Sequence, residues 1–363
     1  MTFPLSYCPN GWERVERLRG LYETRPPDRI FAFVEAPGTA LEAFAQRYAA
    51  GYTGRPDPAE RARFWDELLR ERAAIEDDSI PCAYLSEMDQ GLYGGICGGS
   101  IQYMAHPENG WISSMVPPLL KDWAGFDRLS IDRESEAYRY YRRFLATLLA
   151  TAEGRFGISH FILIDGLNFL FELFGATRAY LEVAENPDRV RQAIDFAYRL
   201  NVDVQTAFFE RVPLVAGGTC SNMAGWIPGR IVSESVDPFH MTSVAYFERW
   251  GREPAARILR TFDGGVLHIH GNGRHLLEAV SSLPGLKAIS LADDRGFPTA
   301  FSVLPELKRR IGDLPAVVSV EYKEFTAALD RHTLTGGTLY KVTRAPGPSE
   351  ANRLMERVRK YRV

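Results

Sequence analysis

Short apolar or β-branched runs alternate with longer amphipathic stretches along most of this chain, and this alternation constrains its fold more than any other feature. Several of the runs are apolar along their whole length, which is typical of parallel strands covered on both faces. Strands that alternate with helices predict an α/β fold with a parallel sheet. The runs are eight in number, as a (β/α)8 TIM barrel requires, and they are Arg29–Glu35, Ile80–Ser86, Phe161–Ile164, Val212–Ala216, Gly265–His270, Leu286–Leu291, Ala316–Glu321 and Gly337–Val342.

A length of 363 residues is ordinary for such a barrel with insertions. We therefore expect one domain, 1–363, in which residues 1–28 form an N-terminal helical extension. The stretch Asp89–Leu120 is rich in Gly, Pro and aromatic residues and indicates a long excursion after the second strand, of the kind that builds active-site lids. Helices are expected at Pro58–Asp77, Ser135–Glu153, Asn186–Arg211 (capped by Asn186), Thr242–Thr261 and Glu350–Tyr361.

Composition and charge exclude several classes of function. The formal net charge is −3, with Lys and Arg mixed among Asp and Glu, so the chain lacks the sustained positive field of a nucleic-acid-binding protein. No run approaches the roughly 18 consecutive apolar residues of a membrane-spanning helix, and the polar N-terminus lacks the apolar core of a signal peptide. The cysteines form no C-x-x-C pair. We expect a cytoplasmic protein with free thiols that acts on a small molecule, and a homo-oligomeric state stays open.

His268 and His270 alternate in the run Gly265–His270, so both imidazoles point to one face of the strand. Two imidazoles on one face are half of a metal site, and the alternative is a hydrogen-bonded polar pair at the mouth of a barrel. Asp293 and Asp294 follow the next strand by two or three residues. A carboxylate there is expected to be a metal ligand or a general base, and the alternative is a solvated loop pair or a helix cap.

Other residues at the carboxyl ends of the expected strands are candidates for catalysis or substrate binding. Glu234 and Asp237 are expected to orient substrate, with helix capping as the alternative for Asp237. Cys220 lies in a loop of small residues that lets a ligand approach, and it is either a reactive or ligating thiol or a buried structural one. Glu321 is a further catalytic candidate. For substrate binding the candidates are Glu35, Trp111 and Asn168, with loop hydrogen bonding or core packing as the alternative.

Four segments together resemble the uroporphyrinogen decarboxylase superfamily, over roughly residues 75 to 363. The first is Gly265–Gly273 (GVLHIHGNG), followed by LLEAVSSLPGLKAISLADD, which is similar to that family's "V-x-H-x-C-G" segment. The others are Ser233–Trp250, Leu167–Phe196 and Pro348–Asn352. The resemblance implies a (β/α)8 barrel with one of two activities: cofactor-free decarboxylation of a porphyrinogen, or zinc-dependent methyl transfer linked to corrinoid proteins.

The first activity depends on arginines in an N-terminal strand motif, "P-x-W-x-M-R-Q-A-G-R", which hold the carboxylate arms of the porphyrinogen. The corresponding segment here, Arg29–Pro37 (RIFAFVEAP), lacks those arginines, and Glu35 stands near their place. A polyanionic substrate in a pocket of low dielectric needs compensating cations. We therefore expect no decarboxylation of a uroporphyrinogen.

The methyltransferase branch of the superfamily holds zinc with a His-x-Cys pair, an acidic residue in some members and a distant C-terminal Cys. The resemblance matches His268 to the His, His270 to the Cys and Asp293 to the acidic residue, while Tyr340 and Lys341 stand near the place of the C-terminal Cys. It therefore implies zinc or another divalent metal on nitrogen and oxygen ligands. It also implies methyl transfer between a small acceptor and a corrinoid partner protein or a small methyl donor.

Two alternatives to a methyltransferase stay open. One is a metal-free carboxy-lyase that acts on a small carboxylated substrate. The other is a ligand-binding barrel that has lost catalysis, because fold alone does not determine function. Metal content distinguishes the methyltransferase from both alternatives.

Overall fold

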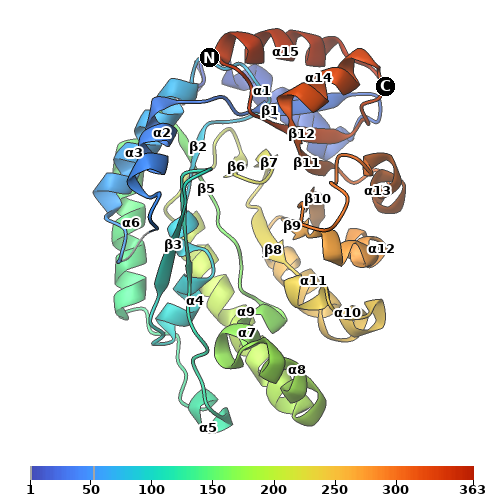
Figure 1. Cartoon of the computed structure of the whole chain (residues 1–363). Helices are drawn as coiled ribbons and strands as arrows, with labels where there is room; N and C mark the ends of the chain where they lie inside the picture. The colour runs from blue at the N-terminus through green and yellow to red at the C-terminus, as the bar shows by residue number, and fades with distance from the viewer. Residues whose placement is uncertain (1, 52–53) are drawn as a thin grey trace.

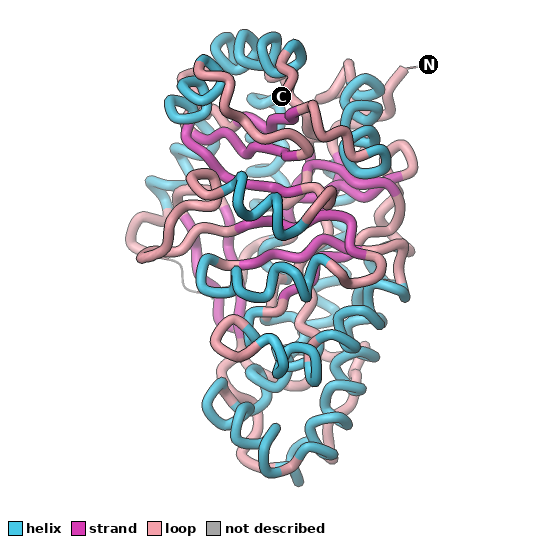
Figure 2. The backbone as a smooth tube through the Cα atoms, turned by 90° about the vertical axis from the view of Figure 1, so that its right-hand side faces the viewer, coloured by secondary structure: helices cyan, strands magenta, loops and turns pink. Residues whose placement is uncertain are grey.

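The computed structural model describes residues 2–51 and 54–363, which form a mixed α/β fold around mainly parallel sheets (Figure 1). One sheet has six parallel strands, which are, in order across the sheet, β1 (Ile30–Val34), β12 (Thr338–Thr343), β11 (Ala316–Glu321), β10 (Leu286–Leu291), β9 (Gly265–Ile269) and β8 (Val232–Ser235). A second sheet has the order β2 (Cys82–Tyr84), β5 (Gly157–Ser159), β6 (Gly218–Ser221) and β7 (Gly225–Pro228). Figure 2 shows the strands stacked through the middle of the molecule with helices around them.

Helices cover the sheets on the outside (Figure 1). In the described part of the chain, none is long and apolar enough to cross a lipid bilayer. The α-helices are α1 (Gly11–Arg19), α2 (Thr39–Arg47), α3 (Pro58–Arg72), α4 (Gly91–Ile96), α5 (Trp123–Phe126), α6 (Glu136–Ala152), α7 (Gly166–Phe174), α8 (Ala176–Glu185), α9 (Pro187–Phe209), α10 (Val244–Trp250), α11 (Arg252–Thr261), α12 (Leu277–Ser281), α13 (Leu304–Ile311), α14 (Tyr322–Asp330) and α15 (Pro348–Lys360).

The expected strand at Val212–Ala216 is wrong. The chain turns there, because Ala216 and Gly217 both adopt the left-handed conformation, with φ of 50° and 80°. The next residues form an antiparallel hairpin from β6 and β7, and the strand beside β9 is β8. Glu234, which was expected at the carboxyl end of a strand, therefore lies within β8.

The expected strand at Phe161–Ile164 forms a single bridge, from Ile162 to Ser233, and the regular ladder lies earlier, in β5. Side chains replace the missing ladder bonds: Asp89 Oδ1 accepts from the backbone N–H of Ile162 at 2.8 Å, and Asn201 Oδ1 accepts from that of Ile164 at 2.9 Å. Buried backbone groups need partners, so these side chains fix the course of the segment where strand pairing does not.

Between β1 and β2, which share no ladder, two aspartates likewise accept hydrogen bonds from backbone N–H groups. Asp78 Oδ2 accepts from the backbone of Ala32 at 3.0 Å, and Asp77 Oδ2 accepts from that of Val34 at 2.7 Å. Both carboxylates are fully buried and ion-paired, Asp78 with Arg17 and Asp77 with Arg72. Polar side chains thus connect the edge of β1 to the segment that leads into β2.

The helices begin and end for local reasons. Ser135 caps α6 by accepting from the backbone N–H of Tyr138 at 3.2 Å. The expected cap of α9 is wrong, because Asn186 makes no side-chain cap bond and donates instead to Glu182 Oε2 at 2.7 Å. The expected helix at Thr242–Thr261 divides into α10 and α11 around Gly251, where a Cβ atom would lie 2.6 Å from the ring of Phe247.

The core has an outer and an inner part. The outer part lies between the strands and the helices. The inner part gathers one apolar side chain from each of several strands, together with the hairpin and the N-terminal segment that includes α1, and its members include Phe31, Val266, Ala288, Val317, Leu339, Trp226, Val15 and Leu18. Because alternate strand residues share a face, side chains two positions further along each strand stand above this inner cluster, toward the carboxyl ends.

The excursion Asp89–Leu120 folds into α4 and a two-stranded antiparallel hairpin, β3 (Gln102–His106) and β4 (Trp111–Met115). A buried arginine holds it in place. Arg61 of α3 is ion-paired with Glu87 and donates to the carbonyl of Gly110 at 2.8 Å. Arg61 therefore anchors the excursion to α3, beside the carboxyl end of β2.

Candidate functional site

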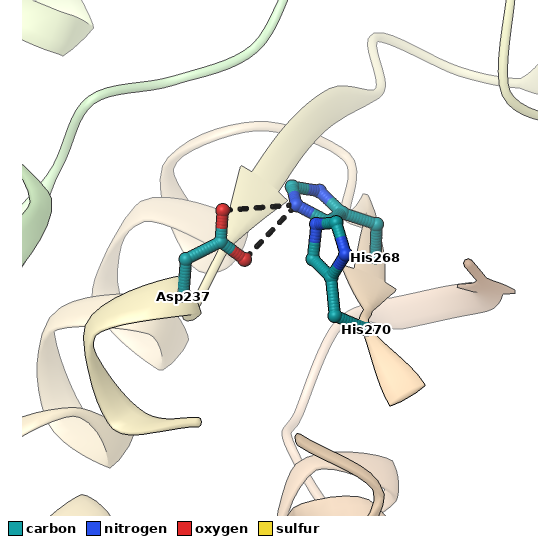
Figure 3. A group of neighbouring side chains, drawn as sticks. All are labelled: Asp237, His268 and His270. Carbon is teal, nitrogen blue, oxygen red and sulfur yellow. Dashed lines mark hydrogen bonds and ion pairs between the residues drawn. The ribbon is translucent and has the colours of Figure 1, made fainter. Parts of the chain in front are cut away.

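Three side chains at the carboxyl ends of β8 and β9 converge on one point (Figure 3). His268 is in β9, His270 follows that strand, and Asp237 begins the short 3-10 helix Asp237–Phe239 after β8. Each offers a potential ligand atom, and the three atoms lie within 4.8 Å of one another. His268 Nε2 is 3.1 Å from Asp237 Oδ1 and 3.3 Å from Oδ2. The expected alternation of the two histidines on one face is therefore what the structure has.

Asp294 holds the second imidazole. Its Oδ1 accepts from Nδ1 of His270 at 2.9 Å, and its Oδ2 accepts from the backbone N–H of Gly271 at 2.8 Å. A carboxylate can only accept, so Nδ1 of His270 carries the proton and Nε2 is left with a free lone pair. A carboxylate behind a histidine in this way is a common feature of metal sites, because it fixes the tautomer and the ring orientation.

A third imidazole, that of His240, borders the same point. Its Nδ1 lies 3.6 Å from Asp237 Oδ1, and its ring centroid is 5.6 Å from that of His270. Burial lowers the pKa of His240 to about 4, so the ring is neutral at pH 7. Among the described residues, Nε2 of His240 and Nδ1 of His268 are buried polar atoms without a hydrogen-bond partner.

The charges of the centre are coupled. Burial alone would raise the pKa of Asp237, but the surrounding histidines, His268 first, together outweigh burial and hold that pKa below its ordinary value. Burial alone would lower the pKa of His268, but the surrounding carboxylates, Asp237 first, together outweigh burial and raise that pKa. A divalent ion at this point would replace the proton of His268, and two imidazoles with one carboxylate are a donor set for such an ion.

Asp293, expected as the carboxylate ligand, is not part of this group. Its Oδ1 accepts from the backbone N–H of Ala300 at 2.6 Å, and the nearest cation is Arg274 at 3.6 Å. Asp293 and Asp294 are adjacent, and only Asp294 faces His270. Asp237, expected to orient substrate, lies where a ligand would.

Glu234 faces the surrounding helices and not the inner side of the sheet. Its side chain points to the same side as those of Val232 and Val236, which belong to the outer core. Glu234 is only 3% exposed. Burial, and then the nearby carboxylate of Asp165, raise the pKa of Glu234 well above its ordinary range. Glu234 is thus buried on the face that packs against the helices, and its expected catalytic role stays a prediction.

The remaining expected site residues are dispersed. Glu321, at the end of β11, is exposed and ion-paired with Arg344 at 2.7 Å. Asn168 donates to the backbone carbonyl of Ser235 at 2.8 Å and so supports the carboxyl end of β8. Cys220 is buried in β6, and hydrogen bonding to Cys82 together with burial raises the pKa of its thiol well above the ordinary range, so it is not a reactive thiolate. Glu35 and Trp111 line a separate cavity.

That cavity, of about 170 Å³, opens beside β1, β2 and β12. Its lining includes Phe33, Tyr84 and Lys341. Sequence reasoning missed Lys341 and the pair of Tyr84 with Asp89 as functional candidates, and it named Asp294 only as an alternative to Asp293. For Lys341 a pattern existed: it follows Leu339 by two positions in a strand, so it shares the inner face of that residue.

Similarity to known proteins is found at the level of the fold. No protein-family model and no curated protein sequence matches it. A solved structure, a methyltransferase from Methanosarcina mazei, matches with a TM-score of 0.60 at 14% sequence identity, over 95% of this chain and 97% of that one. At such an identity the match shows a shared fold along the length of both chains.

Proposed function

We propose that this chain is a methyltransferase whose strands close into a (β/α)8 barrel of the uroporphyrinogen decarboxylase type. The observation that carries the proposal is the group of Asp237, His268 and His270, at the carboxyl ends of neighbouring parallel strands. Barrel enzymes place their active sites at that end. The fold likeness to a methyltransferase over nearly the whole chain supports the choice of reaction.

Closure of the barrel has support on both sides of the six-stranded sheet. Ile162, just after β5, bridges Ser233 of β8, and the buried carboxylates of Asp77 and Asp78 connect β1 to the segment before β2. The strands β2 and β5 then fill the gap between β1 and β8. In this order the barrel has eight parallel strands, and the β6–β7 hairpin is an insertion.

The metal in this proposal is zinc or another divalent ion. Its ligands are the carboxylate of Asp237, Nε2 of His268 and Nε2 of His270, and Asp294 fixes the ring of His270. Two imidazoles and one carboxylate leave a coordination position open, as catalytic zinc sites do. A bound ion would supply Lewis acidity to a methyl acceptor and stabilise its deprotonated form. The methyl donor is a corrinoid on a partner protein, or a small methyl donor.

Metal analysis of purified protein tests the first half of the proposal. Wild type is expected to bind about one divalent ion per chain, and His268→Ala is expected to lose it. His275→Ala is the matched control, because His275 is exposed and its Nε2 contacts only the carbonyl of Thr242, at 2.7 Å. Metal-free protein that keeps full activity in the presence of a chelator would overturn the metal site.

Demethylation of methylcobalamin in the presence of a small acceptor, either a thiol or an organic acid, followed by absorbance, tests the second half. We expect turnover by wild type and by His275→Ala, and loss of turnover in His268→Ala. Protein that binds the metal but leaves methylcobalamin unchanged, alone and with candidate partner proteins, would overturn the corrinoid as methyl donor. Protein that also leaves small methyl donors unchanged would overturn the transferase in favour of the ligand-binding barrel.

A further inference from the structure

Lys341 is a largely buried ammonium group on the inner face of the sheet. It follows Leu339 in β12, and Leu339 belongs to the inner core cluster. Its Nζ lies 5.8 Å from the ring centroid of Phe33, across the neighbouring strand β1, and lines the cavity of about 170 Å³. The charge of this side chain is thus directed into a small cavity.

This ammonium lacks a counter-charge. Its hydrogen-bond partner is the backbone carbonyl of Asn222, at the tip of the β6–β7 hairpin. In the described part of the chain, no carboxylate lies within the 4.0 Å of an ion pair with Lys341. The titratable groups that face it are Glu35, exposed at the rim of the cavity, and the thiol of Cys82.

Two other cations of the same region, both arginines, do have carboxylate partners. Arg17 is paired with Asp78 and Arg72 with Asp77, both through buried carboxylates. A buried cation without such a partner is costly, because the water that it gives up is not replaced by an opposite charge. Burial accordingly lowers the pKa of Lys341. An anion that enters the cavity would supply the missing charge.

The shape and lining of the cavity restrict the anion. Its volume of about 170 Å³ exceeds the roughly 30 Å³ share of one water molecule but is below the size of drug-sized ligand pockets. Aromatic rings of Phe33, Tyr84 and Trp111 form part of its wall. A bare inorganic ion would leave these apolar surfaces uncovered, whereas an organic acid would cover them.

A hydrogen bond joins the wall of the cavity to Asp89, an electrostatic neighbour of the candidate metal centre. Tyr84 donates its hydroxyl to Asp89, which is buried and is an electrostatic neighbour of His268. A ligand that contacts Tyr84 would therefore lie one side chain away from Asp89.

We propose that this cavity binds a small organic acid with an apolar or aromatic body, whose carboxylate pairs with the ammonium of Lys341. In assigning that acid as the methyl acceptor, the inference rests on the proposed function, but the binding itself does not require the metal or the transfer reaction.

Calorimetric titration with phenylacetate and its neutral analogue phenylacetamide tests the proposal. Wild type is expected to bind the acid at least ten-fold more tightly than the amide, and Lys341→Gln is expected to lose that preference. Lys323→Gln, which changes an exposed lysine of α14, is the matched control and is expected to keep it. Inorganic phosphate at equal concentration is expected not to displace phenylacetate.

Equal affinities for acid and amide in wild type would overturn the proposal, and this result needs no variant to fold. A preference for the acid over the amide that survives in Lys341→Gln would also overturn the proposal. Displacement of phenylacetate by phosphate would overturn the claim that the ligand needs an apolar body. The same titration in His268→Ala and in chelator separates this inference from the metal proposal. If the preference for the acid is retained in His268→Ala or in chelator, where the metal is absent, the acid binds in the cavity independently of the proposed function.

Discussion

Replacing Asp294 with Asn should weaken metal binding without removing any proposed ligand. In the structure Asp294 accepts from Nδ1 of His270 at 2.9 Å and from the backbone of Gly271 at 2.8 Å. An Asn side chain has one oxygen and one N–H₂ group, so it can keep only one of these two bonds as an acceptor. The ring of His270 then loses either its fixed tautomer or the support of the loop that follows it.

Loss of such a carboxylate partner typically weakens a metal site by about 10- to 100-fold, which corresponds to about 1.4 to 2.8 kcal/mol. The lower end is the better expectation here, because the side chains of His270 and Asp294 are 36% and 30% exposed and water can replace part of the bond. The assay is competition for zinc with a chromophoric chelator. Asp293→Asn is the control, because Asp293 contacts Ala300 and Arg274 and neither histidine. Unchanged affinity in Asp294→Asn, with weakened affinity in Asp293→Asn, would refute the reasoning and restore Asp293 as the ligand.

Three further outcomes are expected. Gly157→Ala should cost about 1 to 3 kcal/mol of stability by overpacking, because the new Cβ would lie 2.4 Å from Sγ of Cys220; thermal unfolding measures this, and Cys220→Ala should restore part of the loss. Burial raises the pKa of Glu172 to about 8 from an ordinary 4.5, so the native state holds a proton that the unfolded state releases, and stability falls as the pH rises from about 4.5 to about 8. Glu172→Gln should therefore raise the melting temperature at pH 8 and have little effect at pH 4. A larger gain in melting temperature at pH 4 would contradict this pH dependence. The purified protein should not convert a uroporphyrinogen to its decarboxylated product, since Arg29–Pro37 lacks the arginine motif, and measurable conversion would disprove this.

The sequence predicts the parallel strands well where burial on both faces leaves a continuous apolar run. β10 and β11 have the bounds that the sequence indicates, and β9 differs from its prediction by one residue. The prediction is wrong at Val212–Ala216 because a short apolar run also occurs in a turn, and here Pro213 and Leu214 are exposed. The chain turns because the backbone is left-handed at Ala216 and Gly217, and the hydrophobic pattern does not indicate that conformation.

The candidate site was predictable only in part, for a similar reason. His268 and His270 follow from period-two alternation on one strand, a local property. The choice of Asp294 over Asp293 depends on the path of the loop after β10, and the role of Asp237 depends on a turn after β8, a strand that the sequence analysis did not recognise. Lys341 requires knowing which groups surround it, because an unpaired charge is a property of the fold and not of the strand.

The identity of the ligands bears on which chemistry the centre can support. The sequence resemblance implies a methyltransferase branch that holds zinc with thiolates. In this chain the soft donors Cys82 and Cys220 lie in β2 and β6, and Cys220 is buried with a raised thiol pKa. Asp237, His268 and His270 offer harder nitrogen and oxygen donors instead. A bound ion with these ligands keeps more of its positive charge than one surrounded by thiolates, since two of the three ligands are neutral. In the proposed function such a centre would polarise an acceptor more strongly, and it would tolerate an acceptor that carries its own negative charge, as an organic acid held by Lys341 would.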